Sequence, residues 1–470
     1  MSIRYCTLLT LFSIIGFFGC KKSFNQTDSV IKTDEYDRAI IGVGSSYNAT
    51  EVDAREINQD MQKRRALGWR ALEEAIRPVS IKNSQQKIPN WQTWYSATEY
   101  GRILKKALER LTPEELAARA PLSEALIIEV MEEMGDERNV LDQNALAKRI
   151  RAINNAPEGA AGGHFEAVRG FTIFSPEMVI HFLKNYHHLE RCNAFYVSEN
   201  FPAEYVAPNP DNFAPCLDEE FPENAVMVKT VWESSDFPSY KSDLKTLKNT
   251  FKSGQWPESG SVDPSTLSDQ DIYSIVDPNG RRHYLNAIHV STKEVREWVW
   301  ASFWWSEDPD QDFGMDRPNS VSAHYPGFAN YKMCVATDFY EGDSDVGSGL
   351  PMGLAKVLEF TATGMKNASG LQRGLTKADR QRDLTWCANP YLEGNFPLTN
   401  CIGCHQAAPL RMETPMVGKV RNNFPADFPM AYSREFGNAT LEVLFQLDSS
   451  FNGLSPKSEP VPESPPATAP

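Results

Sequence analysis

Residues 401–405 read Cys-Ile-Gly-Cys-His, the one Cys-x-x-Cys-His run in the sequence. Two thiols at this spacing can each bond one vinyl group of a haem, and the adjacent imidazole can then ligate the iron. The same thiols could instead form a redox dithiol, a disulfide or half of a zinc site. A zinc site needs two further Cys or His ligands at short spacing, and none follow. The run therefore predicts one covalent haem c on Cys401 and Cys404, with His405 as the proximal iron ligand.

The sixth iron position decides what such a haem can do. Met412, Met416 and Met430 follow the motif and are the candidates for a distal ligand. A thioether there would give a six-coordinate electron carrier with a raised reduction potential. For any one of these methionines, filling a hydrophobic core is the favoured interpretation, because it is the commonest use of the residue. An open sixth position would instead admit a small substrate or gas, and the sequence singles out no distal catalytic residue.

The first twenty residues resemble a bacterial lipoprotein signal. Arg4 precedes an apolar run over 8–18 that is too short to span a bilayer, and Gly19-Cys20 follows. The two phenylalanines before Gly19 depart from the usual Leu and small residue. Cleavage before Cys20 would leave lipid on its thiol; the alternative is an ordinary secretory signal cut nearby. In both cases we expect an exported protein of the cell envelope, facing the periplasm or on the outer membrane. A lipid on Cys20 would be its only membrane attachment.

The charge balance excludes some partners. The formal net charge is -15 over 470 residues, and there is no basic tract. This argues against nucleic-acid binding and against electrostatic adhesion to anionic lipid. The length allows two or three domains. An electron-transfer role in the cell envelope would require a redox partner protein.

The remaining cysteines suggest disulfides. Cys6 belongs to the signal, Cys20 would carry lipid, and two more cysteines would carry haem. An even number then remains in an oxidising compartment: Cys192, Cys216, Cys334 and Cys387. The pairing nearest in sequence joins Cys192 to Cys216. It also joins Cys334 to Cys387. The alternative is four buried thiols.

The part of the mature chain over 51–160 is predicted to be helical, after a polar segment. Residues 21–50 are polar and indicate a flexible tether. Residues 51–160 carry helix-forming patterns and end at a Gly/Ala hinge. We expect helices over 55–77, 98–111, 122–134 and 144–154. The aromatic run over 89–95 could line a haem or substrate cleft, but core packing is the commoner use of such residues.

A further helix is expected over 175–189, where Ser-Pro-Glu is a typical helix start. His181 and His188 could share one face of this helix and bind a metal. No acid or cysteine stands at ligand spacing beside them, which favours a packed or solvated face.

From residue 225 the pattern favours strands. We expect them over 225–232, 272–276, 284–291 and 297–305, with a hairpin turn at Asn279-Gly280. The acidic run over 307–312 lacks the Gly and the closing Glu of an EF-hand, and the run over 341–345 is similar. We therefore expect acidic surface loops. Residues 454–470 are rich in Pro, Ser and Glu and predict a disordered tail.

The position of the haem motif bears on the fold. Only 470 - 405 = 65 residues follow His405, and the last of them form the Pro-rich tail, which leaves little room for a free-standing helical cytochrome. The haem is therefore expected to lie against a β-sheet formed largely before the motif. The sequence predicts an α+β protein. A helical N-terminal region over 51–160 precedes a β-rich haem c domain over 161–450, which has a long insertion near 306–385.

Three segments of this β-rich part resemble the cytochrome P-460 family. They are the strand Phe221–Lys229, the aromatic strand Glu297–Phe303, and the haem motif with the later Ala426-Asp427-Phe428. The insertion, the helical region and Asn224, where the family has Gly, are departures. The resemblance implies a compact β-rich haem protein that oxidises hydroxylamine or binds nitric oxide. In some members a lysine is also bonded to the haem. Lys229 is the candidate here, with a solvent-facing side chain as the alternative.

Electron transfer by a lipid-anchored monohaem cytochrome is the first hypothesis, because it needs only the haem that the motif predicts. The alternatives are a haem enzyme that oxidises a small nitrogen compound such as hydroxylamine, and a haem protein that binds a small gas. A haem peroxidase with two haems is excluded, since one attachment motif is present.

Overall fold

The computed structural model describes a defined part of the chain. The described residues are 44–80, 87–118, 120–137, 170–186, 221–234, 266–276, 280–295, 298–338, 341–343, 345–367, 385–392, 398, 400 and 401. All of them belong to one unit of the chain, Asp37–Pro470. They include helices and antiparallel strands, which confirms a mixed α+β fold.

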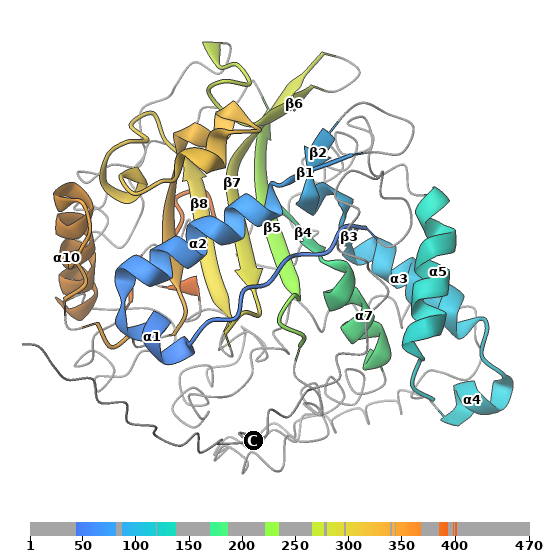
Figure 1. Ribbon diagram of the computed structural model, residues 1–470. Coiled ribbons are helices and arrows are strands. Elements are labelled where there is room, and N and C mark those ends of the chain that lie inside the picture. The colour runs from blue at the N-terminus through green and yellow to red at the C-terminus, as the bar shows by residue number, and fades with distance from the viewer. Residues whose placement is uncertain are drawn as a thin grey trace, which may run out of the picture. The chain divides into compact units, whose positions relative to one another are not determined.

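The main element is a seven-stranded antiparallel sheet (Figure 1). Its path runs β3-β4-β5-β7-β8-β9, and β6 pairs with β7 beside that path. The strands are β3 Tyr95–Ser96, β4 Gly170–Phe174, β5 Val226–Ser234, β6 Ser274–Val276, β7 Arg282–Thr292, β8 Val299–Trp305 and β9 Tyr331–Ala336. A separate two-stranded sheet pairs β1 Pro78–Ser80 with β2 Lys87–Pro89.

The strands expected over 225–232, 272–276, 284–291 and 297–305 are confirmed as β5, β6, β7 and β8. They are rich in Val, Ile and Trp, which fit a pleated surface. Every residue of β8 is buried, so both faces of the sheet are covered there. Gly280 has φ +80° beside the β6–β7 hairpin, a conformation that favours glycine. Asn279 lies outside the described residues.

Strand β9 was not expected from the sequence. It lies inside the segment near 306–385 that we interpreted as an insertion, and it pairs with β8 along its whole length. Its sequence, Tyr-Lys-Met-Cys-Val-Ala, places a lysine at the second position of a buried strand. The Lys332 ammonium is balanced by the carboxylate of Asp312, 2.7 Å away. Part of the predicted insertion is therefore integral to the sheet.

One face of the sheet is covered by α2, Met61–Ala75, which contacts β7, β8 and β9 (Figure 1). Gly68 permits a close approach, because an added Cβ would lie 3.2 Å from the Met333 sulfur. Arg65 fixes the crossing: its guanidinium donates to the Met333 carbonyl at 2.8 Å and to the Asp316 carboxylate at 2.6 Å. This face carries the side chains of alternate strand residues such as Val228.

The single helix expected over 55–77 is wrong in one respect. The helix is interrupted at Asp60, which lies between α1 (Ala54–Gln59) and α2. The Asp60 backbone is extended, and its side chain accepts from the Lys63 N–H at 3.1 Å. Asp60 is therefore the N-cap of α2, and its carboxylate pairs a backbone N–H of the first turn that has no acceptor within the helix.

The remaining helices are α3 Ala97–Leu108, α4 Pro113–Ala118, α5 Glu124–Glu137, α7 Pro176–Lys184 and α10 Met352–Asn367. Short 3-10 turns are η1 Asn90–Thr93, η6 Asp312–Gly314, η7 Asn319–Ser322 and η8 Pro326–Asn330. The expected helices over 98–111 and 122–134 are thus confirmed as α3 and α5. The helix expected over 175–189 is confirmed in its described part as α7, which starts at the N-cap Ser175. Helix α3 begins with a capping box, in which Ser96 and Glu99 bond each other's backbone.

Helices α3, α5 and α7 share a hydrophobic core with the other face of the sheet. Met227, Ala287 and Trp300 contribute to it from the strands. The aromatic run over 89–95 is core as predicted, since Trp91, Trp94 and Tyr95 are all buried.

His181 on α7 is buried, and its ring centroid lies 4.2 Å from that of Phe221. The expected packed position for this histidine is therefore confirmed, while His188 lies outside the described residues.

The acidic run over 341–345 is only in part the surface loop that was expected, since Asp345 is exposed. The side chains of Glu341 and Asp343 are buried, and both carboxylates contact the buried guanidinium of Arg64. Asp312 from the earlier run likewise pairs with Lys332, whereas Asp310 in that run is exposed and pairs with Arg317. Local composition did not show these partners, because Arg64 lies far away in the sequence.

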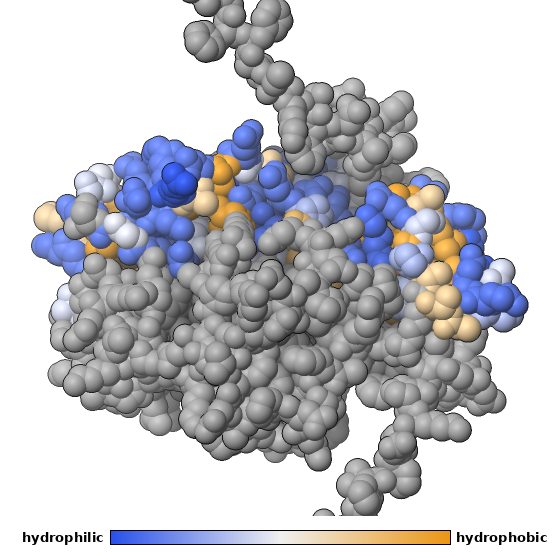
Figure 2. All heavy atoms as spheres, turned by 90° about the horizontal axis from the view of Figure 1, so that it is seen from below, coloured by the Kyte–Doolittle hydropathy of each residue, from blue (hydrophilic) through white to orange (hydrophobic). Residues whose placement is uncertain are grey.

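Several predictions fall outside the described residues. They concern the signal and Cys20, the tether, the helix over 144–154, the hinge, Cys192 and Cys216, most of the haem motif, its downstream methionines and the tail. Among the residues that the structure does describe, no helix has the length and apolar character to cross a membrane. In the view of Figure 2 the described surface is mainly hydrophilic, with hydrophobic residues in small groups.

Candidate functional site

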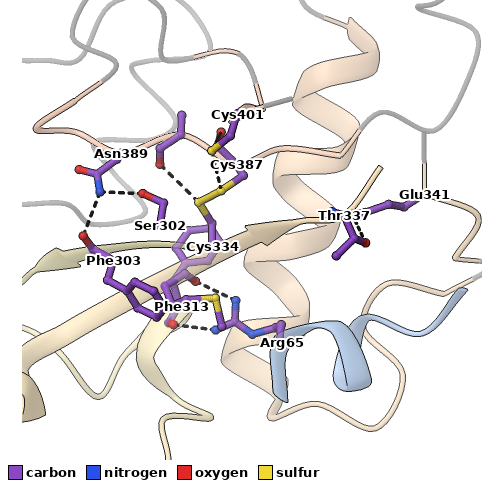
Figure 3. The surroundings of a disulfide bond; sticks show 12 residues. Arg65, Ser302, Phe303, Phe313, Cys334, Thr337, Glu341, Cys387, Asn389 and Cys401 are labelled. Carbon is purple, nitrogen blue, oxygen red and sulfur yellow. Dashed lines mark hydrogen bonds between the residues drawn. A yellow bond between two sulfur atoms is a disulfide. The ribbon is translucent and has the colours of Figure 1, made fainter. Parts of the chain in front are cut away.

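Three sulfur atoms gather on the sheet face opposite α2 (Figure 3). A disulfide joins Cys334 on β9 to Cys387, as the nearest-in-sequence pairing predicted. Cys401, the first thiol of the haem motif, keeps its thiol and places Sγ 3.8 Å from the Cys387 Sγ. All three side chains are buried. Cys401, the first residue of the motif, therefore lies near β9 on this face of the sheet.

The segment 385–392, which carries Cys387, is fixed to β8. The Asn389 amide donates to the Ser302 hydroxyl at 2.8 Å and to the Phe303 carbonyl at 3.0 Å. The Tyr391 hydroxyl contacts the Trp305 carbonyl at 3.4 Å. A chain segment beyond the sheet is thus held along one strand by side-chain hydrogen bonds, and this fixes where Cys387 meets Cys334 (Figure 3).

Aromatic side chains surround the sulfur cluster. The Phe313 ring stacks on Trp386 with centroids 5.2 Å apart and meets Trp304 edge-on at 5.6 Å. Tyr391 is also buried in this cluster. These rings are part of the buried hydrophobic core on this face of the sheet.

A polar row crosses the same face of the sheet. Lys229 on β5 is directly opposite His289 on β7. His289 is opposite Ser302 on β8, and Ser302 is opposite Cys334 on β9. Side chains paired in this way lie on one face, so the row runs from the sulfur cluster for roughly 14 Å to Lys229. His289 and Ser302 are buried, and Lys229 is half-buried.

Sequence reasoning identified Lys229 alone of this row. The signal for Lys229 was the resemblance of its strand to the cytochrome P-460 family, and a polar residue between apolar ones, Ile-His-Val on β7, is the signal that could have pointed to His289. The register that aligns these positions is a tertiary property. It is set by how β5, β7, β8 and β9 pair, and no single strand contains it.

A second group of titratable residues surrounds His181. Burial, followed by the nearby charges of Lys184 and Lys293, lowers the pKa of His181 to about 4. The Lys293 ammonium lies 5.8 Å from the centre of the Trp298 ring. The His181 imidazole packs on Phe221 and is influenced by two nearby ammonium groups, as part of this core.

Of the residues predicted to hold a haem, the structure describes Cys401. Cys401 is buried among aromatic rings on a sheet face that also carries His289, which can donate or accept a proton. Cys404, His405, Met412, Met416 and Met430 lie outside the described residues. In the part of the chain described, no group of three or more His, Cys, Asp or Glu side chains is arranged to hold a metal ion.

Comparison with known proteins gives no relative: no family model, no curated protein and no solved structure significantly matches this chain.

Proposed function

We propose that this protein is an exported, lipid-anchored c-type cytochrome that carries one covalent haem and transfers electrons. The observation that carries the proposal is the position of Cys401. The first thiol of a Cys-x-x-Cys-His run is buried beside aromatic rings on a β-sheet face. A redox dithiol would more typically be exposed to its partner.

The disulfide supports the location that the proposal assigns. Cys334 and Cys387 are joined, and disulfides persist in oxidising compartments such as the periplasm. Haem c is attached in the same compartment. The lipid on Cys20 and the position in the cell envelope are parts of the proposal that rest on the N-terminal sequence.

The architecture proposed is a helical N-terminal region followed by a β-rich haem c domain. Thioether bonds from Cys401 and Cys404 would hold the haem, and His405 would ligate its iron. When bound, this group supplies one-electron chemistry. The aromatic residues around Cys401 would exclude water from that side, and Met412, Met416 or Met430 would fill the sixth position.

A second candidate function rests on the polar row. If no methionine fills the sixth position, Lys229, His289 and Ser302 offer proton donors on the sheet face that Cys401 reaches. Such groups suit a haem enzyme that oxidises a small nitrogen compound such as hydroxylamine, or a haem protein that binds a small gas.

The test is the optical spectrum of the mature protein, produced with haem-attachment machinery. A pyridine-haemochrome signal that survives acid extraction is expected, and the matched variant Cys401→Ala/Cys404→Ala should lack it. Absence of the signal from the wild-type protein would refute every haem-based function. An electron carrier should also be low-spin and unchanged by carbon monoxide. A spectral shift on adding the gas to reduced protein would favour the second candidate, and hydroxylamine turnover would then separate enzyme from gas binder.

A further inference from the structure

We propose that Cys401 and the Cys334–Cys387 disulfide form an exchange system in which Cys387 is the shared sulfur. In one state Cys387 is bonded to Cys334, and the Cys401 thiol is available for haem. In the other state Cys387 is bonded to Cys401, and haem attachment at that position is blocked. The exchange follows from the geometry of the three sulfurs, while its effect on haem rests on the proposed function.

The contact needed for exchange is already present. Disulfides exchange when a thiolate attacks one of the two bonded sulfurs. The Cys401 Sγ is 3.8 Å from the Cys387 Sγ, which is close to van der Waals contact for two sulfurs. The dashed line in Figure 3 joins these two atoms. Cys387 is therefore the sulfur that Cys401 is positioned to attack.

The exchange balances without any oxidant or reductant. The Cys401 thiol loses its proton, and its sulfur forms a bond with the Cys387 sulfur. The bond between Cys387 and Cys334 breaks, and its electron pair leaves with the Cys334 sulfur. Cys334 then takes up one proton. One disulfide and one thiol are present before and after the step.

The protein accommodates the thiol in either state. The Cys401 Sγ lies 4.0 Å from the Cys387 carbonyl oxygen, within reach of a weak S–H hydrogen bond. The Cys334 Sγ lies 3.8 Å from the Ala388 carbonyl oxygen, which could accept from the Cys334 thiol once it is released. Each buried thiol thus has a backbone acceptor, so neither state leaves the displaced sulfur in a purely apolar setting.

Haem attachment would stop the exchange. A Cys401 sulfur in a thioether bond to haem has no proton to lose and cannot attack Cys387. Attachment therefore locks the Cys334–Cys387 disulfide, and the Cys387–Cys401 disulfide delays attachment. The cluster couples the pairing of one structural disulfide to the loading of the cofactor.

The first experiment maps disulfides in the full mature chain made without haem-attachment machinery. Cys404→Ala is used as the background, so that Cys401 cannot pair within its own motif. Thiols are alkylated in acid, and peptides are identified without reduction. In Cys334→Ala, purified in air so that oxygen can oxidise the two remaining thiols, we expect a Cys387–Cys401 disulfide in most chains. Finding both cysteines alkylated there, with the circular dichroism spectrum of the background protein, would overturn the inference.

A matched control removes the shared sulfur instead. Cys387→Ala in the same background leaves Cys334 and Cys401 in place, and we expect both to be alkylated. A Cys334–Cys401 disulfide forming as readily would show that the three sulfurs pair without the assigned order, and would also overturn the inference.

The second experiment measures haem per chain when the attachment machinery is present and Cys404 is native. Cys334→Ala should lose most of its covalent haem, and Cys334→Ala/Cys387→Ala should regain the wild-type level. Both variants lack the disulfide, so a general loss of stability would lower both alike. Equal haem contents in the two variants would overturn the proposed block. If wild-type protein itself carries no haem, the proposed function fails, whereas the disulfide map still decides the exchange.

Discussion

The guanidinium of Arg64 on α2 lies 2.8 Å from the carboxylate of Glu341, and both side chains are buried. The same carboxylate accepts from the Thr337 N–H at 2.9 Å and from the Thr385 hydroxyl. Thr385 begins the segment that leads to Cys387. One buried carboxylate therefore joins the helix on one face of the sheet to the end of β9 and to the chain that carries the sulfur cluster.

We predict that Glu341→Ala strongly destabilises the protein. Its removal leaves Arg64 with one carboxylate fewer, that of Asp343 remaining at 2.5 Å, in a site closed to water. Breaking a buried ion pair typically costs about 3–5 kcal/mol of unfolding free energy. Guanidinium chloride unfolding of the haem-free chain measures the loss. Arg110→Met is the control, because Arg110 pairs with Glu129 and Glu133 at the exposed surface and should change little. Equal midpoints for the two variants would show that the buried pair is unimportant.

Reduction of the Cys334–Cys387 disulfide should also lower stability. The bond links residues 53 positions apart, and closing such a loop restricts the unfolded chain. A native disulfide of this kind contributes about 2–4 kcal/mol. Unfolding with and without dithiothreitol should show the difference in the wild-type chain and none in Cys334→Ala/Cys387→Ala. A reductant effect that persists in the double variant would assign the loss to another disulfide.

The strands that the sequence predicted are those whose signal is local. Val, Ile and Trp at high density marked β5, β7 and β8, whatever their neighbours. Strand β9 escaped prediction because Lys332 interrupts its apolar pattern, and the residue that balances this charge, Asp312, lies in a separate 3-10 turn. Only the pairing with β8 explains why this segment is extended.

The candidate site likewise has one part that the sequence predicted and another that it did not. The haem motif is a short covalent signature, so it was visible in the sequence. The polar row and the burial of Glu341 depend on contacts between residues such as Arg64 and Glu341, which lie hundreds of positions apart. A carboxylate run was interpreted as a surface loop because composition carries no information on a distant arginine.

The His181 side chain should make stability depend on pH. Its pKa is 6.5 in a model peptide and about 4 here, so the folded state holds the imidazole neutral where the unfolded chain would protonate it. The unfolded state then binds more protons, and stability falls as pH decreases from about 6.5 to 4, by about 3 kcal/mol in total. Urea unfolding across this range should show a smaller decrease in His181→Gln. His324→Gln, at an exposed position, should follow the wild-type profile. A His181→Gln profile parallel to the wild type would contradict the assignment.

The identity of the sixth iron ligand is tested by single substitutions of the three downstream methionines. If the protein is an electron carrier, one of Met412→Leu, Met416→Leu and Met430→Leu should abolish the low-spin spectrum and allow carbon monoxide to bind, since leucine matches methionine in size but cannot ligate iron. The other two variants then serve as controls for packing, with unchanged spectra and unchanged haem content.

His289→Leu completes the set, because His289 is buried on the sheet face that Cys401 reaches. It should leave the spectrum unchanged if a methionine is the ligand. If all three methionine variants stay low-spin and His289→Leu alone becomes open to carbon monoxide, the ligand is the histidine of the polar row and the methionine assignment is wrong.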